Sequence, residues 1–179
     1  MSTRTAEFWI SIVLVIYLLL IGLGSAIEVA VNFPQESNGS ITFPVGEDGQ
    51  QQFVPFGSIG SVDQGLVLLA FFAGAAGAFL HAAQSLSSYV GNNAFRASWT
   101  AWYFLRPWIG GILGIAIYIV FRAGLIAGAS AANPYGVAAL GILGGWFSKT
   151  TTDKLQEVFE TLFKTDEDKH RKDKLGGSD

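Results

Sequence analysis

The stretch FWISIVLVIYLLLIGLGSA, residues 8–26, decides the fold class of this chain. It contains no acidic or basic side chain and is rich in Leu, Ile and Val. As an α-helix it rises about 28 Å, enough to cross the hydrocarbon core of a bilayer. A signal peptide is the alternative, because Arg4 precedes the run and Gly24-Ser25-Ala26 resembles a cleavage site. The run is longer than a typical signal peptide core, so we predict a first membrane span over residues 8–27.

The composition agrees with lipid as the solvent. Half of the 179 residues are apolar and only 14% are charged, with the charges gathered mainly at the ends and in the connections. The absence of cysteine excludes disulfides, thiol nucleophiles and thiolate metal sites. The net charge of −3 argues against a nucleic-acid partner, which needs a clustered basic face. No catalytic residue set, metal-ligand pattern or phosphate-binding loop is visible, so we expect no enzyme, metal or cofactor.

Three further apolar segments follow, at residues 64–86, 107–128 and 134–148. The first has a centre of almost only Ala, Gly and Phe, which lets helix backbones approach closely and predicts a buried position. The second is expected to begin at Pro107, because proline is well placed in the first turn of a helix. Together with the first span they predict an all-α integral membrane protein with about four transmembrane helices in a domain over residues 1–149.

The fourth segment is short. Asn133-Pro134 is a strong helix-start signal, but residues 134–147 rise only about 21 Å. The segment is therefore a tilted span, a span continued by the next helix, or a re-entrant half-helix buried in protein. Lys149 and Lys154 just beyond it favour a crossing back to the positively charged side.

The connection over residues 27–61 contains four acidic residues and no Lys or Arg, which predicts a loop outside the cytoplasm. Two short alternating segments, Ser40–Val45 and Gln52–Phe56, flank the turn-like Gly46-Glu47-Asp48-Gly49. This pattern predicts a small β-hairpin. We expect it to be a structural cap; the alternative is that it shapes a pore mouth.

The tail predicts one more helix, over residues 150–165. Its apolar residues fall on a single helical stripe, formed by Leu155, Val158, Phe159, Leu162 and Phe163. The polar face mixes both charges, which weakens its attraction to anionic lipid. We therefore expect it to pack against protein, such as the same helix of neighbouring subunits. Residues 166–179 alternate charges and predict a solvated, disordered tail.

The distribution of basic residues gives an orientation. Ten of the eleven Lys and Arg residues, all except Arg122, fall on one side of this topology. By the positive-inside rule the protein is a multi-pass protein of the cell (inner) membrane, with both termini cytoplasmic.

Arg122 is then a charge within the membrane, and such charges are functional candidates. Glu28 and Asp63, at the same ends of the first two spans, are its expected partners. An Arg–carboxylate pair there would be a structural clamp, which we favour, or the lining of an outer vestibule.

Two more positions deserve a function hypothesis. His81, near Gln84 and Ser85, could act as a pH-sensitive gate, although a lone histidine is more often a packing residue. The Gly- and Ala-rich fourth segment could line a pore through Ala138, Gly141 and Gly145, or use the same residues as a packing face, which we favour.

Several short sequences carry a resemblance over roughly the second half of the chain. They are Tyr89-Val90-Gly91-Asn92, Trp102-Tyr103 with Arg106-Pro107, Arg122-Ala123-Gly124, Asn133-Pro134-Tyr135-Gly136, Gly145-Trp146-Phe147-Ser148, and Lys154-Leu155-Gln156-Glu157-Val158-Phe159. In these the chain resembles small prokaryotic membrane proteins of uncharacterised function. The resemblance implies a membrane protein and a prokaryotic setting, and it implies no activity.

These observations lead to two hypotheses. In the first, the lipid-embedded chain self-associates into a homo-oligomer, such as an ion-conducting pore with the fourth segment near its axis. In the second, it is a non-catalytic structural or regulatory subunit of a larger membrane complex. A transporter is less favoured, because one copy has no paired intramembrane charge site or evident inverted repeat.

Overall fold

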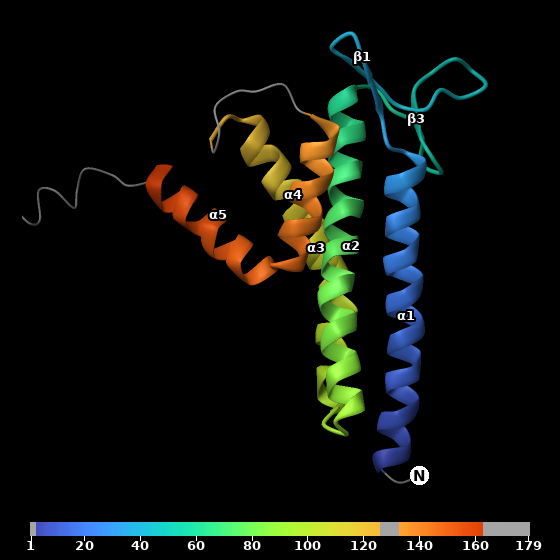
Figure 1. The fold of residues 1–179 in the computed structure, drawn as a ribbon, viewed down its shortest axis with the longest axis vertical. Helices are drawn as coiled ribbons and strands as arrows, with labels where there is room; N and C mark the ends of the chain where they lie inside the picture. Colours follow the sequence, from blue (N-terminus) through green and yellow to red (C-terminus); the bar gives the residue numbers. More distant parts are fainter. Residues whose placement is uncertain (1–2, 126–132, 163–179) are drawn as a thin grey trace, which may run out of the picture.

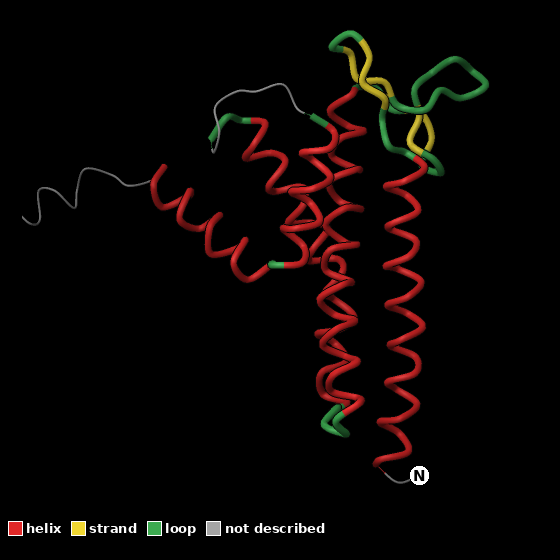
Figure 2. Tube along the Cα trace, in the orientation of Figure 1, coloured by secondary structure: helices red, strands yellow, loops and turns green. Residues whose placement is uncertain are grey.

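The computed structural model describes residues 3–125 and 133–162, and its elements are almost all helical (Figure 1). The helices are α1 (Thr3–Val31), α2 (Val62–Gly91), a 3-10 turn η1 (Ala97–Trp99), α3 (Thr100–Arg122), α4 (Pro134–Trp146) and α5 (Ser148–Leu162). Figure 2 shows the loop segments between α1 and α2 at one end of the bundle, which we call the loop end. The opposite end, where α1 begins and α2 passes into α3, is called the N-terminal end.

Three helices are long and apolar enough to cross a membrane, over Thr5–Val31, Val62–Gly91 and Ala97–Arg122. Their outward faces stay apolar: Leu20 is 70% exposed and Ile112 is 62% exposed. Such surfaces are typical of helices that face lipid, where apolar side chains need no burial in protein. The chain therefore has the features of a membrane protein with three candidate spans.

α2 is the central helix, and glycine lets its neighbours approach it closely. A Cβ atom on Gly74 would lie 2.2 Å from the carbonyl oxygen of Gly110 in α3. A Cβ on Gly77 would lie 1.9 Å from the carbonyl oxygen of Ile142 in α4. Two backbones can approach this closely only where side chains are missing. The small centre of α2 thus holds α3 and α4 together, as its sequence predicted.

α4 is too short to be a fourth span, and a count of four is not confirmed. Its 13 residues rise about 20 Å, against about 45 Å for the 30 residues of α2. It begins at the loop end, where the Asn133 side chain accepts a hydrogen bond from the Tyr135 backbone. Its last turn places Gly145 against Gly74 and Ala78, halfway along α2. The third reading of this segment, a half-helix packed on protein, fits these positions best.

α5 follows α4 after a break at Phe147 and leaves the bundle instead of continuing toward the N-terminal end (Figure 1). It lies beside the loop-end half of α3, with Ile117 and Leu125 facing Leu155 and Val158 across a hollow of about 530 Å³. Over the described residues the predicted helix is present, from Ser148 to Leu162, and residues 163–165 of the prediction lie outside the described residues. The side chains of Leu162 and Phe163, and the tail over 166–179, lie outside the described residues.

α3 begins earlier than the sequence predicted. Pro107 lies inside the helix, which starts at Thr100. Proline removes one backbone hydrogen bond there, and a spanning helix tolerates this where its neighbours supply polar groups. The carbonyl that loses its N–H partner is that of Tyr103. The Tyr17 hydroxyl of α1 donates a hydrogen bond to the next carbonyl, that of Phe104, at 2.9 Å. The last predicted residues of this span, 126–128, lie outside the described residues.

The connection between α1 and α2 contains two short antiparallel pairs. β1 (Gln35–Ser37) pairs with β2 (Ser40–Thr42), and β3 (Gln52–Phe53) pairs with β4 (Gly57–Ser58). The predicted hairpin between residues 40–45 and 52–56 is not confirmed: β2 and β3 each pair with another strand, and Val45 forms one isolated bridge with Gln51, just before the second segment. The turn at Asn38-Gly39, where both residues have positive φ, takes the first segment into another pair.

Candidate functional site

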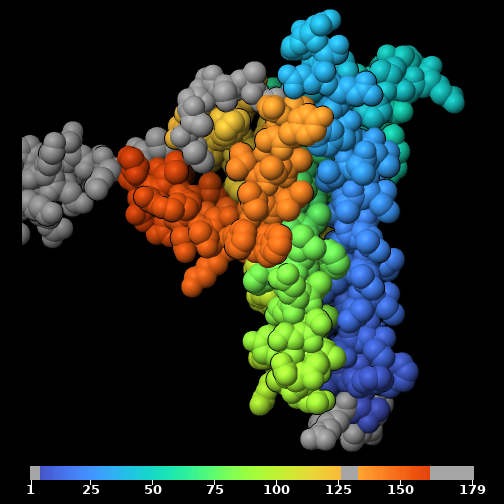
Figure 3. Space-filling model, viewed as in Figure 1, coloured from blue at the N-terminus to red at the C-terminus, as the bar shows by residue number. Residues whose placement is uncertain are grey.

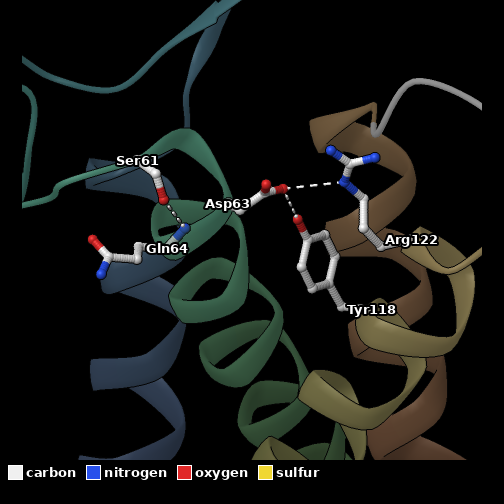
Figure 4. Close-up of polar contacts among 5 residues, drawn as sticks. All are labelled: Ser61, Asp63, Gln64, Tyr118 and Arg122. Carbon is white, nitrogen blue, oxygen red and sulfur yellow. Dashed lines mark hydrogen bonds and ion pairs between the residues drawn. The ribbon is translucent and has the colours of Figure 1, made fainter.

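A polar cluster joins α2 and α3 at the loop end (Figure 4). The Tyr118 hydroxyl donates to Asp63 Oδ1 at 2.6 Å, and Arg122 Nε donates to the same oxygen at 3.2 Å. Tyr118 is 5% exposed, whereas about half of the Arg122 side chain is exposed. The buried hydroxyl orients the carboxylate, and the guanidinium keeps most of its donors available to the surroundings.

The position of Asp63 follows from the start of α2. The Ser61 side chain accepts a hydrogen bond from the Gln64 backbone at 3.2 Å and so caps the helix. Asp63 lies in the first turn, where the positive end of the helix dipole favours a carboxylate. Sequence reasoning paired Arg122 with Asp63 but missed Tyr118. The available signal was its spacing, because Tyr118 and Arg122 are four residues apart on one helical face.

Glu28, the other predicted partner of Arg122, lies in a different network. Its side-chain oxygen accepts a hydrogen bond from the Asn32 amide at 3.0 Å. The same amide donates to the Val54 carbonyl at 2.8 Å, and its oxygen accepts from the Val54 backbone N–H at 2.6 Å. Asn32 has no exposed surface. This residue therefore fixes the long connection onto the end of α1, a role that no sequence pattern indicated.

The predicted pore-lining residues of α4 lie against α2. Ala138 is 7% exposed, and a Cβ on Gly141 would lie 2.9 Å from the Cβ of Ala73. A Cβ on Gly145 would lie 1.9 Å from the Gly74 carbonyl oxygen. Within one chain these three residues form a packing face, which is the role the sequence analysis favoured. The opposite side of α4 is the one left open, with Tyr135, Leu143 and Phe147 exposed.

α5 brings charged side chains to an unusual depth. It starts at Ser148, next to the middle of α2, and extends along the loop-end half of α3. Lys154 donates a 2.6 Å hydrogen bond to Glu157, which raises the pKa of Lys154 and lowers the pKa of Glu157. Both are well exposed. These charges thus lie alongside the helices that are able to cross a membrane, and the described residues leave most of their side-chain surface uncovered.

His81 lies in the C-terminal half of α2, toward the N-terminal end of the bundle and away from the Asp63 cluster. Its ring is 6.2 Å from that of Trp102 in α3, and the Arg106 guanidinium lies 5.1 Å from the same indole. The three side chains form a mixed aromatic and cationic group. Sequence reasoning had named His81 but had not joined it to Arg106. Within residues 3–125 and 133–162, no three His, Cys, Asp or Glu side chains are grouped to hold a metal ion.

Comparison of the chain with protein-family models, curated proteins and solved structures gave no match. The prokaryotic setting implied by the resemblance stays a prediction.

Proposed function

We propose that this protein forms a homo-oligomeric membrane assembly with a water-filled centre that conducts ions. The observation that carries the proposal is the position of α5, a helix with charged side chains that begins beside the middle of α2. Charged groups at the depth of a bilayer are stable only where protein covers them or water reaches them. Neighbouring copies arranged around an aqueous centre supply both.

The half-length of α4 supports the same arrangement. A helix that stops within the membrane is tolerated where its end is buried in protein or faces a water-filled cavity. The face of α4 away from α2 carries exposed apolar side chains, among them Leu143 at 49% and Phe147 at 54% exposed. In the proposed assembly this face lies toward the centre, where an apolar constriction can gate by dewetting.

The hollow between α3 and α5 supports contact between copies. It is lined by apolar side chains such as Ile117 and Val158 together with Thr150 and Thr151. A helix that carries both apolar and polar side chains, such as α5 of a neighbouring copy, suits such a lining. We further propose that the protein lies in the cell membrane with its N-terminus cytoplasmic, because the loop over residues 27–61 has no basic residue. The many basic residues of the tail predict a cytoplasmic C-terminus as well, but α5 extends along the loop-end half of α3, so the course of the chain does not support this part of the prediction.

The alternative function is that of a non-conducting subunit docked on a larger membrane complex. The observation that favours it is the packing of Gly141 and Gly145 on α2, which leaves no glycine-lined channel within one chain. In this alternative the hollow beside α5 receives another protein, and the charges of α5 are covered by that protein.

The first experiment is to purify the full chain in nanodiscs, measure its mass, and image the particles for symmetry. A closed ring with a central opening supports the pore and leads to current recordings in planar bilayers. A monomer or a ring without an opening contradicts it and favours the docked subunit.

The recordings use a matched pair of variants. Leu143→Ser places a hydroxyl on the exposed face of α4 and is expected to raise the conductance, because a polar group eases wetting of a constriction. Ile112→Ser makes the same change on the exposed face of α3 and is expected to leave the conductance unchanged. Equal conductances in all three proteins would remove α4 from the conduction path.

A further inference from the structure

The groove between α2 and α3 is filled by α4 in its loop-end half only. Gly77 of α2 contacts Ile142, and Gly144 of α4 lies against Ile117 of α3, so α4 lies across both helices. Beyond the end of α4 the same faces continue toward the N-terminal end without a covering helix. In Figure 3 the C-terminal half of α2, which lies toward the N-terminal end of the bundle, is open on the side where α4 and α5 cover its other half.

One turn further toward the N-terminal end, the side chains on these faces of α2 and α3 are no longer the small apolar ones that pack in the loop-end half. His81 follows Gly77 by one turn on α2, and Arg106 precedes Gly110 by one turn on α3. Trp102 lies between them, 6.2 Å from the His81 ring and 5.1 Å from the Arg106 guanidinium. The open half of the groove is therefore lined by cationic and hydrogen-bonding groups.

Arg106 lacks the partner that a charge in this position needs. Its Nε is buried and has no hydrogen-bond partner, and among residues 3–125 and 133–162 no carboxylate lies within 4 Å of its guanidinium. The adjacent Trp102 ring attracts the cation but accepts no conventional hydrogen bond. Glu7, the carboxylate of α1 at this end, lines a different hollow beside Asn93 and Phe95. The positive charge is thus left without a compensating anion.

The surroundings match the headgroup region of a lipid leaflet. Arg106 lies six residues after the start of α3, about 9 Å along the helix. Three tryptophans, Trp99, Trp102 and Trp108, mark the same stretch, and tryptophan gathers at the membrane interface. A hollow of about 290 Å³ opens beside Trp102, lined in part by Ser85 and Tyr103, whose hydroxyl groups hydrogen-bond each other at 3.1 Å.

We propose that Arg106, with His81 and Trp102, binds the phosphate of an anionic phospholipid from the leaflet at the N-terminal end. The guanidinium matches a phosphate through parallel hydrogen bonds. The Trp102 ring holds the guanidinium in place. The acyl chains of the lipid extend along the exposed apolar faces of α2 and α3, between the N-terminal end and the last turn of α4. This lipid occupies the half of the groove that α4 does not fill, and its binding does not depend on ion conduction.

The test is native mass spectrometry of the full chain in mild detergent, titrated with phosphatidylglycerol. We expect a saturable bound lipid in the wild type. Arg106→Gln is expected to weaken its binding at least about tenfold, the effect of removing a charged hydrogen-bonding partner. Arg106→Lys is expected to restore part of the affinity, because lysine keeps the positive charge but cannot make the two parallel hydrogen bonds of a guanidinium. The matched control is Arg96→Gln, an exposed arginine at the same end, which should bind as the wild type does.

Two competitors define the ligand in the wild-type protein, so the test does not rest on a variant that fails to fold. Diacylglycerol with the same chains lacks the phosphate and should not displace the lipid. Inorganic phosphate lacks the chains and should not displace it either. Displacement by either one overturns the proposal, as does equal loss in Arg106→Gln and Arg96→Gln. If Arg106→Gln instead changes the oligomer mass with lipid binding intact, the groove holds a second copy and the lipid site is wrong.

Discussion

At the scale of single residues, burial decides which polar contacts matter. Asp63 and Arg122 form an ion pair across α2 and α3, but both side chains are more than half exposed. Exposed pairs contribute little, because water screens the charges and the side chains lose entropy on pairing. Asn32 makes neutral hydrogen bonds and has no exposed surface. Its contacts with Val54 therefore carry more of the stability of the loop end than the ion pair does.

This contrast gives a prediction. Asn32→Ala removes two hydrogen bonds to the backbone of Val54, at about 0.5–1.5 kcal/mol for each bond lost. Thermal unfolding in detergent should show a clear fall in Tm. Glu28→Gln, which keeps an acceptor for Asn32, and Arg122→Gln should both shift Tm less. A larger fall in Arg122→Gln than in Asn32→Ala would show that the exposed pair, not the buried amide, holds this end together.

The glycines of α4 give a second prediction at this scale. A Cβ on Gly145 would lie 1.9 Å from the Gly74 carbonyl oxygen, and a backbone cannot yield as a flexible side chain can. Gly145→Ala is therefore expected to destabilise the protein by about 1–3 kcal/mol or more. Gly24→Ala in α1 is the control, since nothing lies within 4 Å of its Cβ position. It should be neutral or slightly stabilising, because alanine is the better helix former. Equal Tm values for the two variants would contradict the close packing of α4 on α2.

At the scale of elements, the sequence was most informative where local rules decide. Hydropathy and length predict α1 and α2, because a run without charges has few alternatives to a helix in lipid. The Asn133-Pro134 start of α4 was also predictable, because capping depends on neighbouring backbone groups. The pairing of Arg122 with Asp63 was also predictable, since both charges lie at the same ends of neighbouring apolar helices, where few other charges are available.

The rest depended on contacts between distant segments. Which strands pair in the loop is set by Asn38-Gly39 and by the anchoring of Val54 on Asn32, and period-2 patterns in such short segments do not specify a partner. The break after Trp146 was hidden because the charges beyond it suggested a crossing. Its position follows from Gly145 meeting the middle of α2. The grouping of His81 with Arg106 required the packing of α2 on α3, which spacing in one chain does not give.

α5 carries the prediction that belongs to this scale. The chain has no cysteine, so single cysteines can be placed without a background. Thr150 is exposed on α5, and Ile112 is exposed on α3. If α5 faces water in the assembly, Thr150→Cys should react with a charged thiosulfonate at least about tenfold faster than Ile112→Cys, because the thiolate that reacts forms in water. Equal slow reaction at both sites, in membrane vesicles, would place α5 in a dry contact and favour the docked subunit.

At the scale of the whole molecule, the described residues divide into a closely packed bundle, α1 to α4, and a loosely attached helix, α5. α1, α2, α3 and α4 pack on one another through the small faces of α2 and the buried side chains of two apolar clusters. α5 is joined to them through a single break and is separated from α3 by a hollow. A helix whose apolar stripe is only partly covered by the described part of its own chain is most stable when another chain completes the cover.

Removing α5 should therefore separate folding from assembly. A chain ending at Phe147 keeps all four packed helices, so its helical circular dichroism per residue and its Tm should stay close to those of the full chain. Its mass in nanodiscs should fall to that of one chain, because the hollow beside α3 loses the helix that we expect a neighbour to contact. As a control, Phe159→Ala shortens one exposed side chain of the α5 stripe and should weaken the assembly only in part. A truncated chain that keeps the mass of the full assembly would place the subunit contacts on the lipid-facing sides of α1 and α3, and α5 would then have to find its cover outside this protein.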